Sequence, residues 1–320
     1  MLPSTSEKRT GLTNSPPKMR LGTRKSPLAM VQAVEARGRL CAAHGWDKGD
    51  VELVPVTASG DKIQDRPLAE IGGKALWTKE LDAWLASGEI DVAVHSAKDV
   101  ETIRPDVFCF GAVLERADRR DCLIGAASIA DIAKGAIVGT SAPRRAAQLL
   151  NLRPDCTIAM LRGNVATRLA KLEAGEADVT FLAAAGLERL DQSDVGVPLN
   201  AGHWLPAAGQ GAIVLECRDS DSATKSALAP LNHLRSQREL EAERALLASL
   251  GGSCHSPVAV LCESDGDALT MRAAIFSPDG KERVDDEATF AVSDHEKVGT
   301  LGRQLLERAS PAILEHFDAS

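Results

Sequence analysis

Short apolar runs alternate along the first third of the chain with segments whose apolar residues recur at helical spacing. Four of these runs have the length of a strand, at residues 19–22, 51–56, 91–95 and 107–114. Pro27 opens a helix, because the first helical residue needs no backbone N–H, and Leu28, Val31 and Val34 form its apolar side. A second helix is expected at residues 76–86. Strands that alternate with helices predict an α/β domain with a largely parallel sheet.

A second set of the same kind follows a charged stretch at residues 115–121, which we interpret as a crossing between domains. Its strands are expected at residues 123–124, 136–139, 157–161 and 179–183. Its helices begin at Pro143 and after Asn164, whose side chain suits a helix N-cap. A further strand at residues 212–216 follows a glycine-rich turn and can return to the first sheet.

The last part of the chain predicts a small α+β unit. A helix ends at Leu250, and Ser236 with Glu239 fits a capping box at its start. Strands at 258–262 and 271–276, a turn at 277–280, a hairpin strand at 283–290 and a helix at 293–307 follow. The expected division is a disordered tail at 1–17, domain 1 at 18–114 plus 212–230, domain 2 at 118–206 and domain 3 at 231–320.

The composition narrows the class of protein. With 44% hydrophobic and 26% charged residues the chain is globular, and a formal net charge of −8 makes nucleic acid an unexpected partner. No apolar run is long enough to span a bilayer, and residues 1–17 lack the apolar core of a signal peptide. The seven cysteines are scattered without a C-x-x-C pair, which argues against disulfides or a zinc site and favours a cytoplasmic protein.

Paired arginines at two strand-to-helix junctions are the first candidate chemistry. Arg144 and Arg145 end the stretch 139–145, and Arg162 and Arg168 lie in the stretch 161–168. A helix start attracts anions, and guanidinium groups fork onto carboxylates or phosphates. Solvated surface arginines are the alternative. The G-x-x-x-x-G-K-[ST] phosphate loop is absent from the sequence, so a nucleotide is not favoured.

Two further stretches carry reactive side chains. Lys98 and Asp99 follow a strand, at the edge where α/β sheets bind ligands, although a plain salt bridge would also explain them. Cys254 lies in the glycine-bearing loop 251–257, where a buried, unreactive thiol is the alternative. The long polar loop from Thr57 to Gly73 is a candidate lid.

Together these stretches resemble the porphobilinogen deaminase family, also called hydroxymethylbilane synthases. The resemblance covers the chain from Arg20 to the C-terminal helix. The matching segments keep the family's order and spacing, at residues 20–29, 94–100, 139–145, 161–168, 182–190, 206–212 and 251–257. It implies two periplasmic-binding-protein-like α/β domains plus a small C-terminal α+β domain.

The resemblance also implies an activity. Cys254 would hold a dipyrromethane cofactor through a thioether. The enzyme would condense four porphobilinogen molecules head to tail with loss of ammonia and release hydroxymethylbilane. The implied protein is a cytoplasmic monomer that binds a small-molecule substrate and neither nucleic acid nor membrane.

Site residues are implied position by position. Asp99 would relay protons and stabilise the azafulvenium cation left by ammonia. The residues implied to bind cofactor or substrate are Arg24, Ser26, Lys74, Lys98, Thr140, Ser141, Arg144, Arg145, Arg162, Arg168, Arg189 and Gln210. Two departures from the family pattern stand out: Glu70 replaces a lysine of some members, and Ala142-Pro143 replaces Ser-Leu, which removes one hydroxyl.

Two rival classes remain open at this stage. A two-lobed binding protein for organic anions would suit the same fold, but it leaves Cys254 and its domain without a purpose. A phosphate-handling enzyme ranks last, since neither a phosphate loop nor a metal-binding pattern occurs in the sequence.

Overall fold

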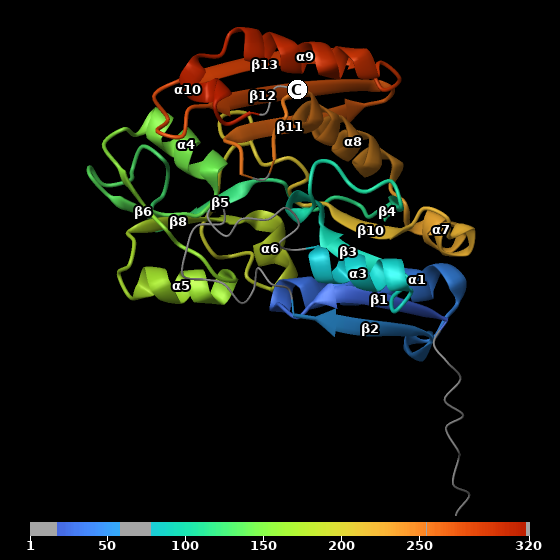
Figure 1. Ribbon diagram of the computed structural model, residues 1–320. Coiled ribbons are helices and arrows are strands. Elements are labelled where there is room, and N and C mark those ends of the chain that lie inside the picture. Colours follow the sequence, from blue (N-terminus) through green and yellow to red (C-terminus); the bar gives the residue numbers. More distant parts are fainter. Residues whose placement is uncertain (1–17, 58–77, 254, 318–320) are drawn as a thin grey trace, which may run out of the picture.

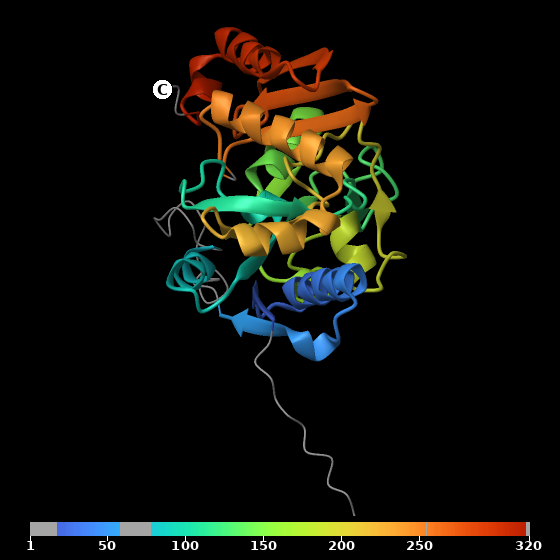
Figure 2. The ribbon, with the colours of Figure 1, turned by 90° about the vertical axis from the view of Figure 1, so that its right-hand side faces the viewer.

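Three sheets, each with its own helices, make up the computed structural model, which describes residues 18–57, 78–253 and 255–317 (Figure 1). The chain builds most of the first sheet, then the second, returns once to the first and ends in the third. The sequence-based α/β assignment with a smaller C-terminal α+β unit is therefore confirmed. The third sheet lies at the opposite end of the molecule from β1 and β2 in both views (Figure 2).

The first sheet has the strand order β2-β1-β3-β10-β4. Its strands are β1 (Met19–Arg24), β2 (Val51–Val56), β3 (Val92–Ser96), β4 (Phe108–Val113) and β10 (Ile213–Arg218). β1 pairs in parallel with β2 and β3, whereas β10 runs antiparallel between β3 and β4. The strand expected near residue 212 thus does return to the first sheet. Helices α1 (Pro27–His44), α3 (Lys79–Ser87) and α7 (Ser222–Leu228) accompany this sheet, with short 3₁₀ turns at Lys48–Asp50, Ala97–Asp99 and Ala229–Leu231.

The buried face of α1 differs from the expected one. Its buried residues include Ala29, Ala33 and Ala36, whereas Val34 is 47% exposed. Small side chains let a helix axis approach a sheet closely, and the larger β-branched residues are left at the margin. The expected apolar side was therefore wrong at Val34, whereas Leu28 and Val31 are half-buried.

The second sheet has the order β7-β6-β8-β5-β9. Its strands are β5 (Asp121–Ile124), β6 (Ile137–Gly139), β7 (Thr157–Ala159), β8 (Val179–Ala183) and the two-residue β9 (Val197–Pro198). Its helices are α4 (Pro143–Leu152), α5 (Val165–Glu173) and α6 (Ala184–Arg189). Asn164 caps α5 by accepting from the Thr167 amide at 2.9 Å, as expected. β9 and α6 were not anticipated, because both are too short to show a periodicity.

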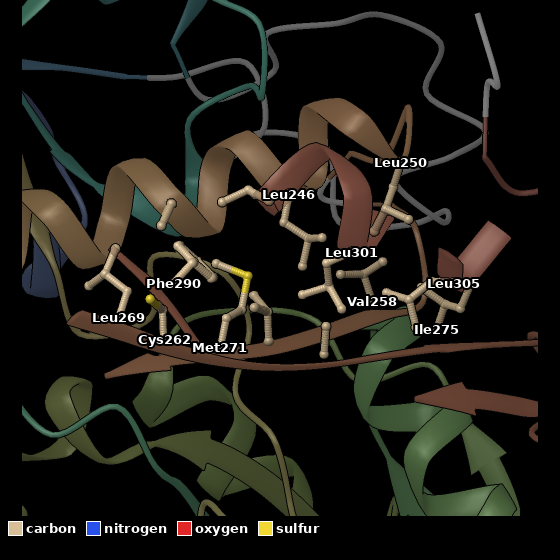
Figure 3. Packing of buried hydrophobic residues seen from close by; sticks show 14 of the residues in the cluster. Leu246, Leu250, Val258, Cys262, Leu269, Met271, Ile275, Phe290, Leu301 and Leu305 are labelled. Carbon is tan, nitrogen blue, oxygen red and sulfur yellow. The ribbon is translucent and has the colours of Figure 1, made fainter. Parts of the chain in front are cut away.

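The third sheet is the antiparallel meander β11 (Val258–Asp265), β12 (Ala268–Phe276) and β13 (Arg283–Ala291). Helices α8 (Leu234–Ser249), α9 (His295–Glu307) and α10 (Pro311–Leu314) belong to this unit. Leu246, Met271 and Leu301 meet in its core, on the face of the sheet that α8 and α9 cover (Figure 3). Alternate strand residues such as Ala259 and Phe276 point to the other face and pack with Ala147 of α4.

The predicted capping box of α8 is corrected. His233 caps the helix, with its side chain accepting from the Ser236 amide. Ser236 instead accepts a hydrogen bond from the Arg116 amide at 2.9 Å, and Glu239 pairs with Arg119 at 2.8 Å. Ser236 and Glu239 have the sequence spacing of a capping box, but in the fold both side chains bind residues from a distant segment instead.

The charged stretch after β4 and the turn before β10 connect the sheets, as expected of crossings. Arg116 forms a bidentate ion pair with Glu243 of α8, which also accepts from the Gly209 amide at 2.8 Å. Gly211 has a φ of 87°, and a side chain there would meet the Ala117 carbonyl, so glycine is required. The domain boundaries drawn from the sequence remain our proposal.

Candidate active site

The candidate active site begins at the carboxyl end of β3. Ser96 leads into the 3₁₀ turn Ala97–Asp99, and the adjacent parallel strand β1 ends in Arg24. Arg24 Nη1 lies 3.6 Å from Asp99 Oδ2, and 37% of the Asp99 side chain is exposed. The geometry brings these two sequence-predicted residues together and leaves a carboxylate accessible at the sheet edge, where ligands of α/β proteins bind.

Lys98 lies beside Asp99 in a positively charged environment. Burial lowers the pKa of the Lys98 ammonium from 10.5 to about 8, and repulsion by Arg145 adds to the shift. Asp99 and Asp121 oppose it without cancelling it. A lysine that holds its charge this weakly gains from a bound anion, because a carboxylate would favour the charged form.

The predicted arginine pair is held by an aspartate that the sequence analysis had not singled out. Asp121 accepts from Arg144 Nη2 at 2.8 Å and from Arg145 Nη2 at 2.7 Å, and it also accepts from Trp204 Nε1 and Gln210 Nε2. Burial alone would raise the pKa of Asp121, but the two guanidinium groups outweigh it and hold the pKa far below its usual range. The carboxylate is therefore a permanent anion in the core of domain 2.

Each arginine of the pair is fixed by a second contact as well. Arg144 donates to the Leu205 carbonyl at 2.9 Å, and Arg145 donates to the Phe181 carbonyl at 2.8 Å. Both side chains are only about one-twentieth exposed. The Nε atom of Arg145, however, is buried and finds no hydrogen-bond partner among the described residues. Arg145 thus keeps a buried donor that could serve a ligand, while the printed hydrogen bonds of the pair serve the fold.

Arg168 and Arg162 extend the positive charge from α5 and the turn before it. Arg168 Nε donates to the Gly163 carbonyl at 2.9 Å. Burial lowers the pKa of Arg168 to about 10, helped by repulsion from Arg145 and Arg162, while Asp99 opposes the shift. Arg162 is 6% exposed. Asp99, which follows β3 of the first sheet, is therefore near enough to Arg168 of α5 to influence its pKa.

Two of the remaining predicted polar residues, Ser26 and Thr140, serve local structure. Ser26 accepts from the Ala29 amide as the N-cap of α1, and Thr140 Oγ1 accepts from the Ala142 amide at 3.2 Å. Ser141 is half-buried. At the N-terminus of α4, Ala142 provides no side-chain cap, in keeping with the hydroxyl that this sequence lacks.

Arg189 and Gln210 bridge segments that are far apart in sequence. Arg189 Nε lies 3.1 Å from Glu35 of α1, and its Nη atoms donate to the Gly211 carbonyl at 3.4 Å. Gln210 donates to Asp121 and to the Arg119 carbonyl, and its own Oε1 is buried without a partner among the described residues. In both Arg189 and Gln210, some polar atoms of the side chain already bind the protein and are not available to a ligand.

Some predictions fall outside the described residues. These are Cys254, Lys74, Glu70 and nearly all of the candidate lid. In the part of the chain that the structure describes, no helix is long and apolar enough to cross a membrane.

Asp121, Trp204 and Gln148 are the structural residues of this site that sequence reasoning missed. Trp204 stacks on Phe181 with ring centroids 4.7 Å apart, and Gln148 donates to the Leu205 carbonyl. The one available signal was an aspartate at the start of an apolar strand, a position where a buried carboxylate needs cationic partners.

Comparison with known proteins decides the family. Residues 19–226 match the family model for the dipyromethane cofactor binding domain of porphobilinogen deaminase, and residues 237–309 match that for its C-terminal domain. The chain belongs to the porphobilinogen deaminase family.

Curated relatives agree along almost the whole length. A porphobilinogen deaminase of Sphingopyxis alaskensis is 55% identical over 305 residues, which cover 93% of this chain and 96% of the relative. One of Nitrobacter hamburgensis is 45% identical over 301 residues, 93% of this chain and 95% of the relative. Among solved structures, a TRAP periplasmic solute binding protein of Desulfovibrio salexigens matches with a TM-score of 0.40 at 11% identity, over 68% of this chain and 73% of that one. The family membership rests on the sequence matches and not on this structural likeness.

Proposed function

We propose that this chain is a hydroxymethylbilane synthase that condenses four porphobilinogen molecules head to tail, with loss of ammonia. The observation that carries the proposal is the group of buried and half-buried cations around one accessible carboxylate, Asp99. Porphobilinogen bears an acetate and a propionate on each pyrrole, so the lengthening product gains negative charge at every addition. A site with more buried positive than negative charge suits such a ligand.

The described residues fit a dipyrromethane. Its acetates and propionates require cationic donors, and Lys98, Arg145 and Arg168 offer them in a desolvated setting. The unpartnered Nε of Arg145 is a donor that a carboxylate would satisfy. When bound on Cys254, the group supplies a covalent anchor and an acceptor pyrrole.

Asp99 is the residue we assign to proton transfer. Loss of ammonia from porphobilinogen leaves a cationic pyrrole, and a carboxylate close to the ring N–H stabilises that charge. Arg24 holds Asp99 in place through the 3.6 Å ion pair, while the exposed part of the carboxylate remains open to substrate. Turnover then depends on Asp99, and the arginines and Lys98 contribute mainly to binding.

The test is intact-mass spectrometry combined with a porphobilinogen assay. The native protein should carry the additional mass of two linked pyrrole units, and Cys254→Ser should carry none. Equal masses, after allowance for the substitution, would refute the attachment. An organic-anion binding protein would instead give no colour with Ehrlich's reagent and no turnover. The monomeric state, the cytoplasmic location and the absence of nucleic-acid or membrane partners stay predictions.

A further inference from the structure

Arg244 of α8 binds the backbone directly after Asp99. Its Nη2 donates to the carbonyls of Glu101 and Thr102 at 2.7 and 2.9 Å, and its Nη1 lies 3.5 Å from the Val100 carbonyl oxygen. A guanidinium can serve three neighbouring acceptors because its donors form a planar fork, which an ammonium cannot copy. One side chain of domain 3 thus holds three consecutive residues of domain 1.

The Arg244 guanidinium has no carboxylate bonded to it among the described residues. Its other contact is the ring of Phe110, 4.9 Å from the guanidinium carbon. Burial lowers the pKa of Arg244, repulsion from Arg104 adds to this, and Glu216 and Glu101 oppose it. Burying the Arg244 guanidinium costs free energy, and its hydrogen bonds within the described part of the chain go to backbone carbonyls and not to a carboxylate. This arrangement indicates that the position of residues 100–102 matters.

A second contact joins the same segment to the loop that leads to Cys254. Thr102 Oγ1 donates to the Gly252 carbonyl at 2.9 Å, and Gly252 precedes Cys254 by two positions. Gly252 is itself buried and donates to the Leu247 carbonyl at 2.8 Å. The backbone before the attachment cysteine is therefore bonded on one side to α8 and on the other to the segment after Asp99.

Residues 97–104 are also bonded to the rest of domain 1. Arg104 forms ion pairs with Asp82, Glu101 and Glu216 at 2.6 to 2.8 Å. The Val100 amide donates to the Ala97 carbonyl, which continues the connection into the turn that carries Asp99. Residues 97–104 thus form a connection, held by hydrogen bonds and ion pairs, between the Asp99 turn and domain 3.

We propose that Arg244 and Thr102 are positioning residues that hold Gly252, two positions before Cys254 in the sequence, in register with the Asp99 turn. This inference rests on the proposed function, in which Cys254 anchors the acceptor pyrrole and Asp99 acts on it. A displacement of about 1 Å between reacting groups costs on the order of 10²-fold in rate, so a contact that fixes their separation affects turnover more than binding.

The experiment compares Thr102→Val, which keeps the shape and removes the donor, with Thr102→Ser, which restores a hydroxyl. Thr102→Val should lower kcat for porphobilinogen about fivefold, the worth of one hydrogen bond, with KM within about twofold and the bound cofactor mass retained. Thr102→Ser should recover kcat to within about twofold. Arg244→Lys should lower kcat on the order of tenfold, because several donors are lost together.

Two matched controls lie in the same domain. Thr270→Val removes a hydroxyl contact to Thr289 on the exposed side of β12, and Arg238→Lys alters an arginine of α8 whose side chain is 29% exposed. Both should leave kcat within about twofold of the native value.

Hydrogen exchange gives a readout that does not depend on activity. Peptides covering residues 97–104 and 247–253 should exchange faster in Thr102→Val than in the native protein or Thr270→Val. Unchanged kcat in Thr102→Val, failure of Thr102→Ser to recover, or unchanged exchange in both peptides would each overturn the inference. If the native protein shows neither turnover nor the additional pyrrole mass, the proposed function fails. The exchange comparison then still decides whether the hydrogen bond from Thr102 to Gly252 holds residues 97–104 and 247–253 together.

Discussion

Asp121 and Arg145 form the shortest ion pair of the buried domain 2 cluster, with Oδ1 and Nη2 2.7 Å apart. Arg144 binds the other carboxylate oxygen at 2.8 Å, so a single anion supports both arginines of the junction at residues 139–145. One carboxylate cannot neutralise two guanidinium groups, and the remaining positive charge is available to a carboxylate-bearing ligand. The same cluster therefore stabilises domain 2 and contributes to its charge.

Replacing Asp121 by asparagine should strongly destabilise the protein. The change leaves two buried guanidinium groups without their counter-ion, which costs about 3–5 kcal/mol in the free energy of unfolding. Urea unfolding followed by circular dichroism measures the difference. Asp118→Asn is the control, because its partner Arg120 is 44% exposed and the loss should stay below about 1 kcal/mol. Equal effects of the two substitutions would contradict the role assigned to Asp121.

Replacing Asp99 by asparagine should stop turnover without removing the cofactor. Loss of a general acid–base group lowers kcat about 10²–10⁴-fold. The assay is porphobilinogen consumption, with intact mass to verify the bound pyrroles. Asp106→Asn changes an exposed aspartate seven positions further along the chain and should leave kcat unchanged. Near-native activity of Asp99→Asn would remove this residue from the mechanism.

Lys98 should titrate at an unusually low pH in cofactor-free Cys254→Ser. Its pKa in the folded protein is about 8, against an ordinary value of 10.5. The unfolded chain therefore binds more protons between these two values, so the free energy of unfolding contributed by Lys98 is lowest below pH 8 and rises toward pH 10.5. Amine labelling with acetic anhydride, read by peptide mass spectrometry, should be half-maximal near pH 8.

Lys281 provides the surface reference for that titration, because 81% of its side chain is exposed. In the cofactor-loaded protein the midpoint for Lys98 should move upward, since bound carboxylates favour the ammonium form. A Lys98 midpoint that coincides with that of Lys281 in the cofactor-free protein would exclude the charge environment described here.

Neighbouring positions on α1 should respond in opposite ways to substitution. Ala33 is fully buried against the first sheet, so Ala33→Met should cost about 1–3 kcal/mol through overpacking. Val34 is 47% exposed, and Val34→Ser should change stability by less than about 0.5 kcal/mol. Thermal unfolding compares the two variants. A larger loss of stability in Val34→Ser than in Ala33→Met would show that Val34 lies on the buried face, as the sequence pattern had predicted.

Sequence periodicity predicted most strands and helices, because alternation and capping are local properties. Val179–Ala183 and the Asn164 cap lie where the pattern placed them, and the strand expected at residues 19–22 forms and extends to Arg24. The pattern failed where a distant segment competed. On α1 the sheet selected alanines over valines, and on α8 Ser236 became an acceptor for Arg116.

The candidate site divides in the same way. The sequence, together with the family resemblance, predicted the residue types of the site. It also predicted that Lys98 and Asp99 follow a strand. Only the tertiary structure decided that Arg144 and Arg145 share Asp121, that Arg24 faces Asp99, and that Thr102 contacts Gly252. Asp121 and Trp204 are 83 positions apart and Thr102 and Gly252 are 150 apart, and no local spacing encodes such pairs. Local periodicity follows from backbone geometry, whereas the partner of a buried charge is set by which elements pack together.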